Sequence, residues 1–178
     1  LGRKSDTQID FQQDNKLFIA PSFTWRPNVD TTFTILSHYQ KIDNKGYEQY
    51  VPGELSLFSP PLGRIPYSRY LGEPSIDGYN LEQASIGYAF EHRLNEYLQF
   101  RQNLRYSDLE SRNRTVAVAS LAANQRTLNR RVTASNETAQ TFGVDNQLQA
   151  DFRTGPLTHK LLFGVDGYWA DGTAFTGA

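Results

Sequence analysis

The chain contains no cysteine and no methionine among its 178 residues. The lack of cysteine excludes disulfide frameworks, thiolate zinc sites and cysteine nucleophiles. No apolar run approaches the ~18 residues of a membrane-spanning helix. The net charge of −1 gives no general attraction to nucleic acid, so no nucleic-acid partner is expected. Only 38% of the residues are hydrophobic, which is little for an ordinary packed core. Membrane β-strands, which are short and amphipathic, are compatible with all of these absences.

Aromatic residues are plentiful, at 13% of the chain, which argues against a disordered protein. They fall into segments with a period of two. In YLQFRQNLRY, residues 97–106, Phe100 and Leu104 share one face, whereas Arg101 and Arg105 share the other. This alternation predicts β-strands whose two faces meet different surroundings. It recurs in KLFIAPSFTWRP, TTFTILSHYQK, SIGYAFEH, TFGVDNQLQADF and HKLLFGVDGYW.

The connections between these strands alternate in length. Polar segments containing Pro, Asn, Asp or Gly predict tight turns at residues 26–31, 93–96 and 153–157. Residues 41–80 and 107–135 are much longer and predict irregular loops. Loops of this length count against a compact soluble domain. Short turns at one end and long loops at the other are typical of outer-membrane barrels.

A soluble sandwich, with its apolar faces inward, would produce the same alternation. Three features favour the membrane barrel: the loop asymmetry, the aromatic residues near strand ends, and the charges of both signs on the polar faces. We therefore predict an all-β fold, an antiparallel transmembrane β-barrel. The side chains expected to face lipid are Phe23, Trp25, Phe33, Ile35, Phe100, Leu104, Val144, Leu148, Phe163 and Val165, and those expected to face the lumen are Arg101, Arg105, Asp145 and Asp151.

Longer stretches resemble a known family. Five segments together look like parts of TonB-dependent siderophore receptors: FIAPSFTWRPNVDTTFTILSHYQK, GRIP, GEP, IGYAFEHRLNEYLQFRQNLRY and VDNQLQADFRTGPLTHKLLFGVDGY. The ferrichrome and ferric-hydroxamate branch is the most similar. The resemblance runs from residue 16 to residue 169, with the motifs in the same order.

The resemblance implies a bacterial outer-membrane protein whose 22-stranded barrel is filled by an N-terminal plug domain. Residues 1–178 are then expected to be a partial barrel domain, an arc of roughly six or seven strands without the plug domain or TonB box. The ends of the chain, which starts without methionine and stops at DGTAFTGA, fit the same expectation of a piece of a longer protein. By analogy, four segments are expected to be loops that face the outside of the cell: residues 8–15, 41–80, 107–135 and 170–178.

The resemblance also implies partners. Expected are a ferric siderophore, TonB through the missing N-terminal region, and outer-membrane lipid and lipopolysaccharide. Iron would enter already chelated by the siderophore, so no cofactor and no protein ligand to iron is expected. The protein would be a receptor and not an enzyme, and this segment alone would not be competent for transport.

In the resembling receptors, an aromatic residue before a small apolar residue and a proline contacts the ligand. Tyr50, before Val51 and Pro52, matches that position, and Tyr47 lies beside it. Aromatic rings would pack the organic shell of the chelate, and Arg and Tyr would hydrogen-bond its oxygens. Girdle or loop packing is the alternative role of the same residues, and lipopolysaccharide binding or solvation is the alternative for arginines. The remaining candidates are Arg64, Tyr67, Arg69 and Tyr70, for which loop packing is the favoured role, and Arg112 and Arg114, for which lipopolysaccharide binding or solvation is favoured.

Two other protein classes stay open. A small outer-membrane barrel with enzymatic activity, or a passive pore, would need about this length, and a soluble lipocalin-like binding protein would also show alternating strands. The three histidines, His38, His92 and His159, lack metal-ligand spacing. Glu91, Asp145 and Asp151 are expected to form charge ladders with the two lumen-facing arginines, and not an acid–base pair.

Overall fold

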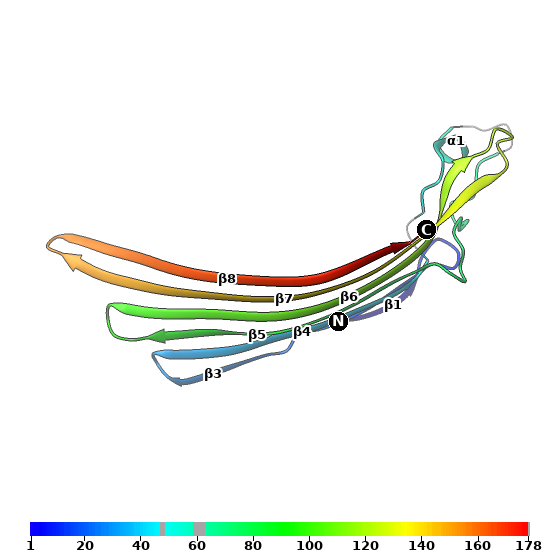
Figure 1. Ribbon diagram of the computed structural model, residues 1–178. Coiled ribbons are helices and arrows are strands. Elements are labelled where there is room, and N and C mark those ends of the chain that lie inside the picture. The colour runs from blue at the N-terminus through cyan, green and yellow to red at the C-terminus, as the bar shows by residue number, and fades with distance from the viewer. Residues whose placement is uncertain (47–48, 59–62, 178) are drawn as a thin grey trace.

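The computed structural model describes residues 1–46, 49–58 and 63–177, which form one long antiparallel sheet and a single short helix (Figure 1). The all-β, antiparallel fold expected from the sequence is confirmed. The elements are β1 (Gly2–Asp6), β2 (Gln13–Ile19), β3 (Ser22–Asn28), β4 (Thr31–Lys45), α1 (Gly53–Ser56), β5 (Gly78–Arg93), β6 (Leu98–Leu121), β7 (Leu128–Thr154) and β8 (Leu157–Gly177).

The sheet follows the order β1-β2-β4-β5-β6-β7-β8, with β3 also paired to β4. β2 and β3 pair with successive parts of β4, so the eight strands fill seven positions across the sheet. The interruption between them falls at Pro21, which has no N–H to donate to a ladder. The Pro21 carbonyl oxygen still accepts from the Ser37 N–H at 3.1 Å, so β4 keeps a partner at the break.

All tight turns between neighbouring long strands lie at one end of the sheet, and the long β4–β5 connection and the tip of the β6–β7 hairpin lie at the other (Figure 1). We call these the turn end and the loop end. The predicted turns are confirmed, because β3 and β4, β5 and β6, and β7 and β8 are each joined by a few residues. The β4–β5 loop, residues 46–77, is the long connection that the sequence predicts within residues 41–80.

The predicted loop at residues 107–135 is wrong. β6 runs on to Leu121 and β7 begins at Leu128, so most of that segment is an extended hairpin. Residues 170–178 were also expected as loop, but β8 continues to Gly177. A strand needs only ~9–11 residues to cross a bilayer, whereas β6 has 24 and β7 has 27. Beyond the apolar zone both faces of a strand meet polar surroundings. The strand therefore continues there without the alternation of apolar and polar residues by which a sequence predicts it.

The ladder register separates the two faces as predicted. Residues opposite one another in an antiparallel ladder share a face, and Phe100 pairs with Leu148, which pairs with Phe163. The other residues predicted to face lipid lie on this same apolar face, namely Phe23, Trp25, Phe33, Ile35, Leu104, Val144 and Val165. Arg101, Arg105, Asp145 and Asp151 all lie on the opposite, polar face.

The predicted charge ladder with an arginine is confirmed for Glu91, whereas Asp151 pairs with a lysine instead. Arg101 pairs with Glu91 across the β5–β6 ladder at 3.0 Å, and Lys160 pairs with Asp151 across the β7–β8 ladder at 3.4 Å. Asp145 instead accepts hydrogen bonds from Asn103 and Gln147. The polar face therefore carries both ion pairs and side-chain hydrogen bonds.

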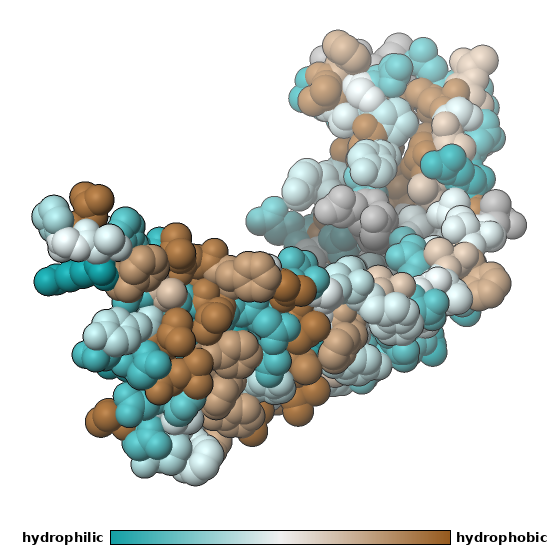
Figure 2. Space-filling model, turned by 60° about the vertical axis from the view of Figure 1, so that its left-hand side comes forward, coloured by the Kyte–Doolittle hydropathy of each residue, from teal (hydrophilic) through white to brown (hydrophobic). Residues whose placement is uncertain are grey.

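The sheet is a single layer with almost no core. Among the described residues the buried hydrophobic side chains are Leu55, Tyr70 and Val116, all at the loop end. Large apolar side chains such as Trp25, Phe163 and Val165 are exposed. Figure 2 shows hydrophobic residues gathered over the part of the sheet near the turn end, giving way to hydrophilic ones toward the loop end. No second layer of described residues covers these side chains.

No helix in the described part of the chain is long and apolar enough to cross a membrane.

The sheet is also open. Within the described residues β8 pairs only with β7, and β1 pairs only with β2. A small complete barrel would close by pairing its first and last strands. The open edges fit the predicted arc of a larger barrel instead.

Candidate functional site: the β4–β5 loop

The loop end is organised around the β4–β5 loop. Within it α1 forms one turn of helix, whose Leu55 side chain is buried. The Leu55 carbonyl oxygen accepts from the Ile65 N–H at 3.0 Å, and Ser56 Oγ donates to the Pro52 carbonyl oxygen at 3.1 Å. The loop therefore has internal structure of its own, although it contains little regular secondary structure.

The strongest feature of the loop is Asp77, the residue immediately before β5. Its side chain is 5% exposed and accepts three hydrogen bonds. Oδ2 accepts from the Tyr70 hydroxyl at 2.5 Å and from the Glu73 N–H at 2.7 Å. Oδ1 accepts from the Val116 N–H of β6 at 2.6 Å. We call Tyr70, Glu73, Asp77 and Val116 the Asp77 network.

The network requires glycine at position 72. A Cβ built there would lie inside the contact distance of Asp77 Oδ2 and 2.6 Å from the Tyr70 hydroxyl oxygen. No side chain fits in that space while Tyr70 and Asp77 remain hydrogen-bonded. Gly72 thus allows the backbone to pass close to the carboxylate.

Gln49 connects this network to the other half of the loop. Its Oε1 accepts from the Leu71 N–H at 2.8 Å, and its Nε2 donates to the Arg69 carbonyl oxygen at 2.9 Å. Tyr50 is the next residue. Its side chain is 73% exposed and lies at a small cleft that Tyr70 and Thr115–Val118 also line. An exposed ring is thus attached to a backbone segment with defined partners.

Two further contacts hold the loop down. On β7, Arg130 Nη1 donates to the Gly72 carbonyl oxygen at 2.8 Å, and Nη2 lies 3.6 Å from Glu73 Oε2. From the turn between β1 and β2, the Asp10 N–H donates to the Ser68 carbonyl oxygen at 2.8 Å. The loop is thus attached to three separate parts of the sheet.

The structure places the other loop candidates in different roles. Tyr70 is only 9% exposed and its hydroxyl is used by Asp77, which is the loop-packing role. Arg64 donates to the Leu57 carbonyl oxygen at 3.3 Å. Tyr67 and Arg69 have exposed side chains. Tyr47 lies outside the described residues.

Arg112 and Arg114 are not gathered with Tyr50. The β6 register runs without a shift from Leu98 to Val118, so both arginines share the face of Phe100, the apolar one. Arg112 forms an ion pair with Glu110. A groove that also includes Lys45 and Asp77 is lined by both arginines. They lie on the side of the sheet away from the polar face.

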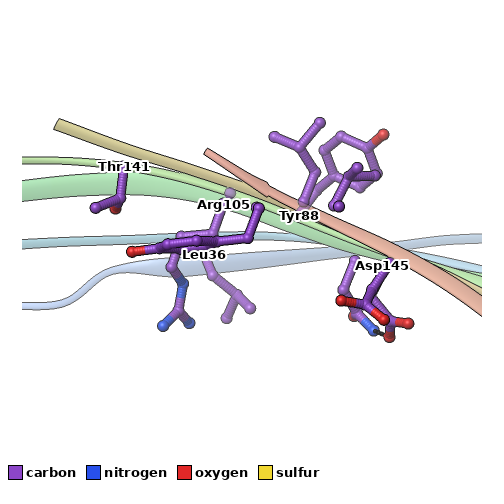
Figure 3. Close-up of a pocket in the computed structure, with 13 residues that line it drawn as sticks. Leu36, Tyr88, Arg105, Thr141 and Asp145 are labelled. Atoms are coloured by element: carbon purple, nitrogen blue, oxygen red, sulfur yellow. Dashed lines mark hydrogen bonds between the residues drawn. The ribbon is translucent and has the colours of Figure 1, made fainter. Parts of the chain in front are cut away.

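A second hollow, of about 480 Å³, lies farther down the sheet on the polar face. Arg105 lines it, with Gly87 and Gly143 directly opposite on the two neighbouring strands. Figure 3 shows Arg105, Leu36 and Asp145 on one side of the ribbons and Tyr88 on the other, as the register requires. None of the described loop tyrosines reaches this hollow.

No group of three or more His, Cys, Asp or Glu side chains that could hold a metal ion occurs within residues 1–46, 49–58 and 63–177. His38 instead lies 2.7 Å from Ser85 Oγ, and His92 lies 2.9 Å from Thr31 Oγ1, in each case through Nδ1.

No family model matches the chain. Among curated proteins it is 32% identical to the ferrioxamine receptor of Yersinia enterocolitica, over 93% of this chain and 23% of that protein. It is 33% identical to the ferrichrome outer membrane transporter/phage receptor of Escherichia coli K12, over 93% of this chain and 24% of that protein. The chain belongs to the TonB-dependent siderophore receptors. It spans about a quarter of the length of these relatives.

Solved structures agree on the fold. The ferric preacinetobactin receptor BauA of Acinetobacter baumannii superposes with a TM-score of 0.77 over 99% of this chain and 26% of its own, at 11% identity. FpvAI in its complex with pyocin S2 gives a TM-score of 0.82 over 98% of this chain and 24% of its own, at 15% identity. The sheet therefore has the fold of an arc of these barrels. The outer-membrane localisation expected from the sequence is confirmed by membership of the receptor family.

Sequence reasoning missed Asp77, Gln49 and Val116 as members of the loop structure. Asp77 and Val116 are 39 residues apart in the chain, and no periodic pattern connects them. The one local signal is GEPSIDG, residues 72–78, where Gly, Pro and Asp are typical of turn structure. That signal predicts a turn but not its partner on β6.

Proposed function

We propose that the complete protein is an outer-membrane receptor for TonB-dependent uptake of ferric siderophores, with hydroxamate siderophores favoured. The observation that carries the proposal is the exposed ring of Tyr50 on a loop attached to three parts of the sheet. The printed names of two relatives, a ferrioxamine receptor and a ferrichrome transporter, support the hydroxamate class. The relatives are receptors and transporters, which supports a non-enzymatic role.

Recognition at the loop end would rest on aromatic packing and a few polar donors. Tyr50 and Tyr67 present exposed rings that would pack against the organic shell of a chelate. Arg64 and Arg69 are exposed cations on the same loop and would donate to its oxygens. Iron would stay bound to the siderophore, so the protein would need neither a cofactor nor a ligand to the metal.

Transport would need the rest of the receptor. The chain spans about a quarter of its relatives, so the plug domain and the contact with TonB would lie outside these 178 residues. The open edges of the sheet support this arrangement, because β1 and β8 would pair with neighbouring strands of the complete barrel. The arc would then contribute one wall of the barrel and one ligand-binding loop.

Outer-membrane lipid and lipopolysaccharide are the proposed partners of the apolar face. Arg112 and Arg114 project from that face at the loop end, where the exposed apolar side chains of Phe175 and Val132 lie on the neighbouring strands. Cations at this level would lie where the phosphates of lipopolysaccharide are found. Their position supports a lipid contact more than a contact with siderophore.

Uptake by cells tests the proposal directly. The complete receptor would be expressed in a strain that lacks its own hydroxamate-siderophore receptors, and uptake of radioactive iron as ferrichrome and as ferrioxamine B would be measured. We expect uptake of at least one chelate that disappears when TonB is deleted. A ferric catecholate would serve as the comparison substrate. A receptor that assembles in the membrane but transports neither hydroxamate would contradict the proposal.

A further inference from the structure

Asp77 is a buried carboxylate surrounded by hydrogen-bond donors. An ionised carboxylate only accepts, and the three groups that reach it, from Tyr70, Glu73 and Val116, all donate. The Asp77 backbone is also paired, since its N–H donates to the Glu73 carbonyl oxygen at 2.8 Å and its own carbonyl oxygen accepts from the Gly46 N–H at 3.3 Å. The first and last residues of the loop therefore meet at Asp77.

The Val116 contact replaces a missing strand. The β5–β6 ladder ends at the pair Gly78–Arg114, so β6 has no β5 partner at Val116. Val116 is nevertheless buried, and a buried N–H without an acceptor is costly. The Asp77 carboxylate takes the place of a strand carbonyl at this edge. The loop is thereby attached to the part of β6 that extends beyond β5.

A chain of contacts leads from Asp77 to Tyr50. Tyr70 is held through its hydroxyl by Asp77, and the residues on either side of it, Arg69 and Leu71, are bound by the Gln49 amide. Tyr50 follows Gln49 directly, and Pro52 restricts the backbone just beyond it. The direction of the Tyr50 ring thus depends on contacts that lead to the Asp77 carboxylate. Asp77 itself does not line the Tyr50 cleft.

We propose that Asp77 is the positioning residue of the binding loop, which holds Tyr50 in its ligand-binding arrangement by attaching the loop to the exposed edge of β6. The identity of the ligand rests on the proposed function. The new element is a residue that supports ligand binding without contacting the ligand. Asp77 acts through Tyr70 and Gln49 and touches no ligand.

The test compares Asp77→Asn with Asp43→Asn in the complete receptor. The introduced asparagine has the same shape as Asp77 but presents an NH₂ group to donors, so part of the network is lost. Asp43 is exposed, lines the same groove as Asp77, and makes no side-chain hydrogen bond or ion pair within the described residues. Trypsin cleavage after Arg64 and Arg69 reports release of the loop. Equilibrium binding of ferrichrome and ferrioxamine B reports the site.

We expect Asp77→Asn to assemble as a barrel, to be cleaved in the loop roughly tenfold faster, and to bind the preferred chelate about tenfold or more weakly. Asp43→Asn should match the wild type in both assays. Adding Tyr50→Ala to Asp77→Asn should cost less affinity than Tyr50→Ala costs in the wild type. The reason is that a Tyr50 ring already displaced by Asp77→Asn makes little contact with the chelate, so its removal changes little. A structural role without positioning would give additive losses.

Wild-type cleavage and wild-type affinity in Asp77→Asn would overturn the proposal. If the wild type bound neither chelate, the proposed function would fail, and the cleavage assay alone would still decide whether Asp77 holds the loop. If Asp77→Asn did not assemble, Tyr70→Phe, which deletes a single hydroxyl, would take its place with the same expected direction. Failure of both variants to assemble would also overturn it, since Asp77 would then be required for folding.

Discussion

Gly87 of β5 lies directly opposite Arg105 of β6, and no side chain fits between the two strands at that point. A Cβ on Gly87 would fall inside the contact distance of the Leu104 carbonyl oxygen and 3.1 Å from Arg105 Cα. Gly143, on the other side of Arg105, is different, because a Cβ there would make an ordinary 3.6 Å contact with Tyr168 Cδ2. Of these two glycines in one row, only Gly143 has room for a Cβ atom.

Gly87→Ala is therefore expected to destabilise the barrel by about 1–3 kcal/mol, the range found for overpacked sites. Gly143→Ala is expected to change stability by no more than about 0.5 kcal/mol. Urea unfolding of the purified receptors in detergent would measure both. Equal effects of the two substitutions would contradict this interpretation of the β5–β6 approach.

The face assignment gives a second prediction, on neighbouring residues of β6. Leu104→Arg places a charge on the apolar face and is expected to cost about 2–4 kcal/mol if the site lies near the bilayer midplane. Asn103→Arg places the same charge on the polar face, beside Asp145, and is expected to be tolerated. The amount of folded receptor in the outer membrane would compare them. A polar face that rejects arginine while the apolar face accepts it would reverse the assignment.

Tyr50 gives a prediction about the ligand. Tyr50→Ala should weaken binding of the cognate ferric siderophore several-fold or more, because an aromatic contact contributes about 0.5–1.5 kcal/mol beyond its buried area. Assembly should be unchanged, since the exposed ring lies outside the strand ladders. Tyr97→Ala, at the turn end, is the matched control and should bind normally. Unchanged affinity in Tyr50→Ala would mean that the ring only packs the loop.

Gly72 gives an independent route to the Asp77 network. Gly72→Ala should separate Tyr70 from Asp77, because the added methyl group occupies the space of their hydrogen bond. Faster tryptic cleavage of the loop and weaker chelate binding are expected, as for Asp77→Asn. Gly53→Ala lies in α1 of the same loop, where the new methyl group would meet Phe58 at an ordinary 3.6 Å. Cleavage that increases equally in both variants would show only that the loop is sensitive to any substitution.

Much of the sheet was predictable because a lipid face and a wet face impose a period of two. Phe100, Leu148 and Phe163 were assigned to one face from alternation alone, and the ladders join them in one row. The upper halves of β6 and β7 were not predictable in this way. Residues such as Arg112 and Ser111 occupy opposite faces there, yet both are polar, so the alternation that marks a strand is lost.

The organisation of the loop could not be read from the sequence for a different reason. Tyr50 could be singled out by local motif, but its support comes from Asp77 and Val116, which are brought near by the β5–β6 pairing. Tyr70 is a candidate for ligand contact as well as for loop packing in the sequence, because exposed and buried tyrosines look alike in one chain. Only the hydroxyl contact with Asp77 distinguishes its role.

The attachment of the loop at its β5 end separates two tasks along one segment. Asp77 and Glu73 fix the loop to the barrel, whereas the exposed residues between Tyr50 and Arg69 form its free surface. Exposed side chains in that interval, such as those of Tyr50 and Tyr67, are thus open to exchange without disturbing the strands beneath. If the proposed function holds, such a receptor would change its chelate preference through substitutions at the tip of one loop, while its wall and its assembly stay unchanged.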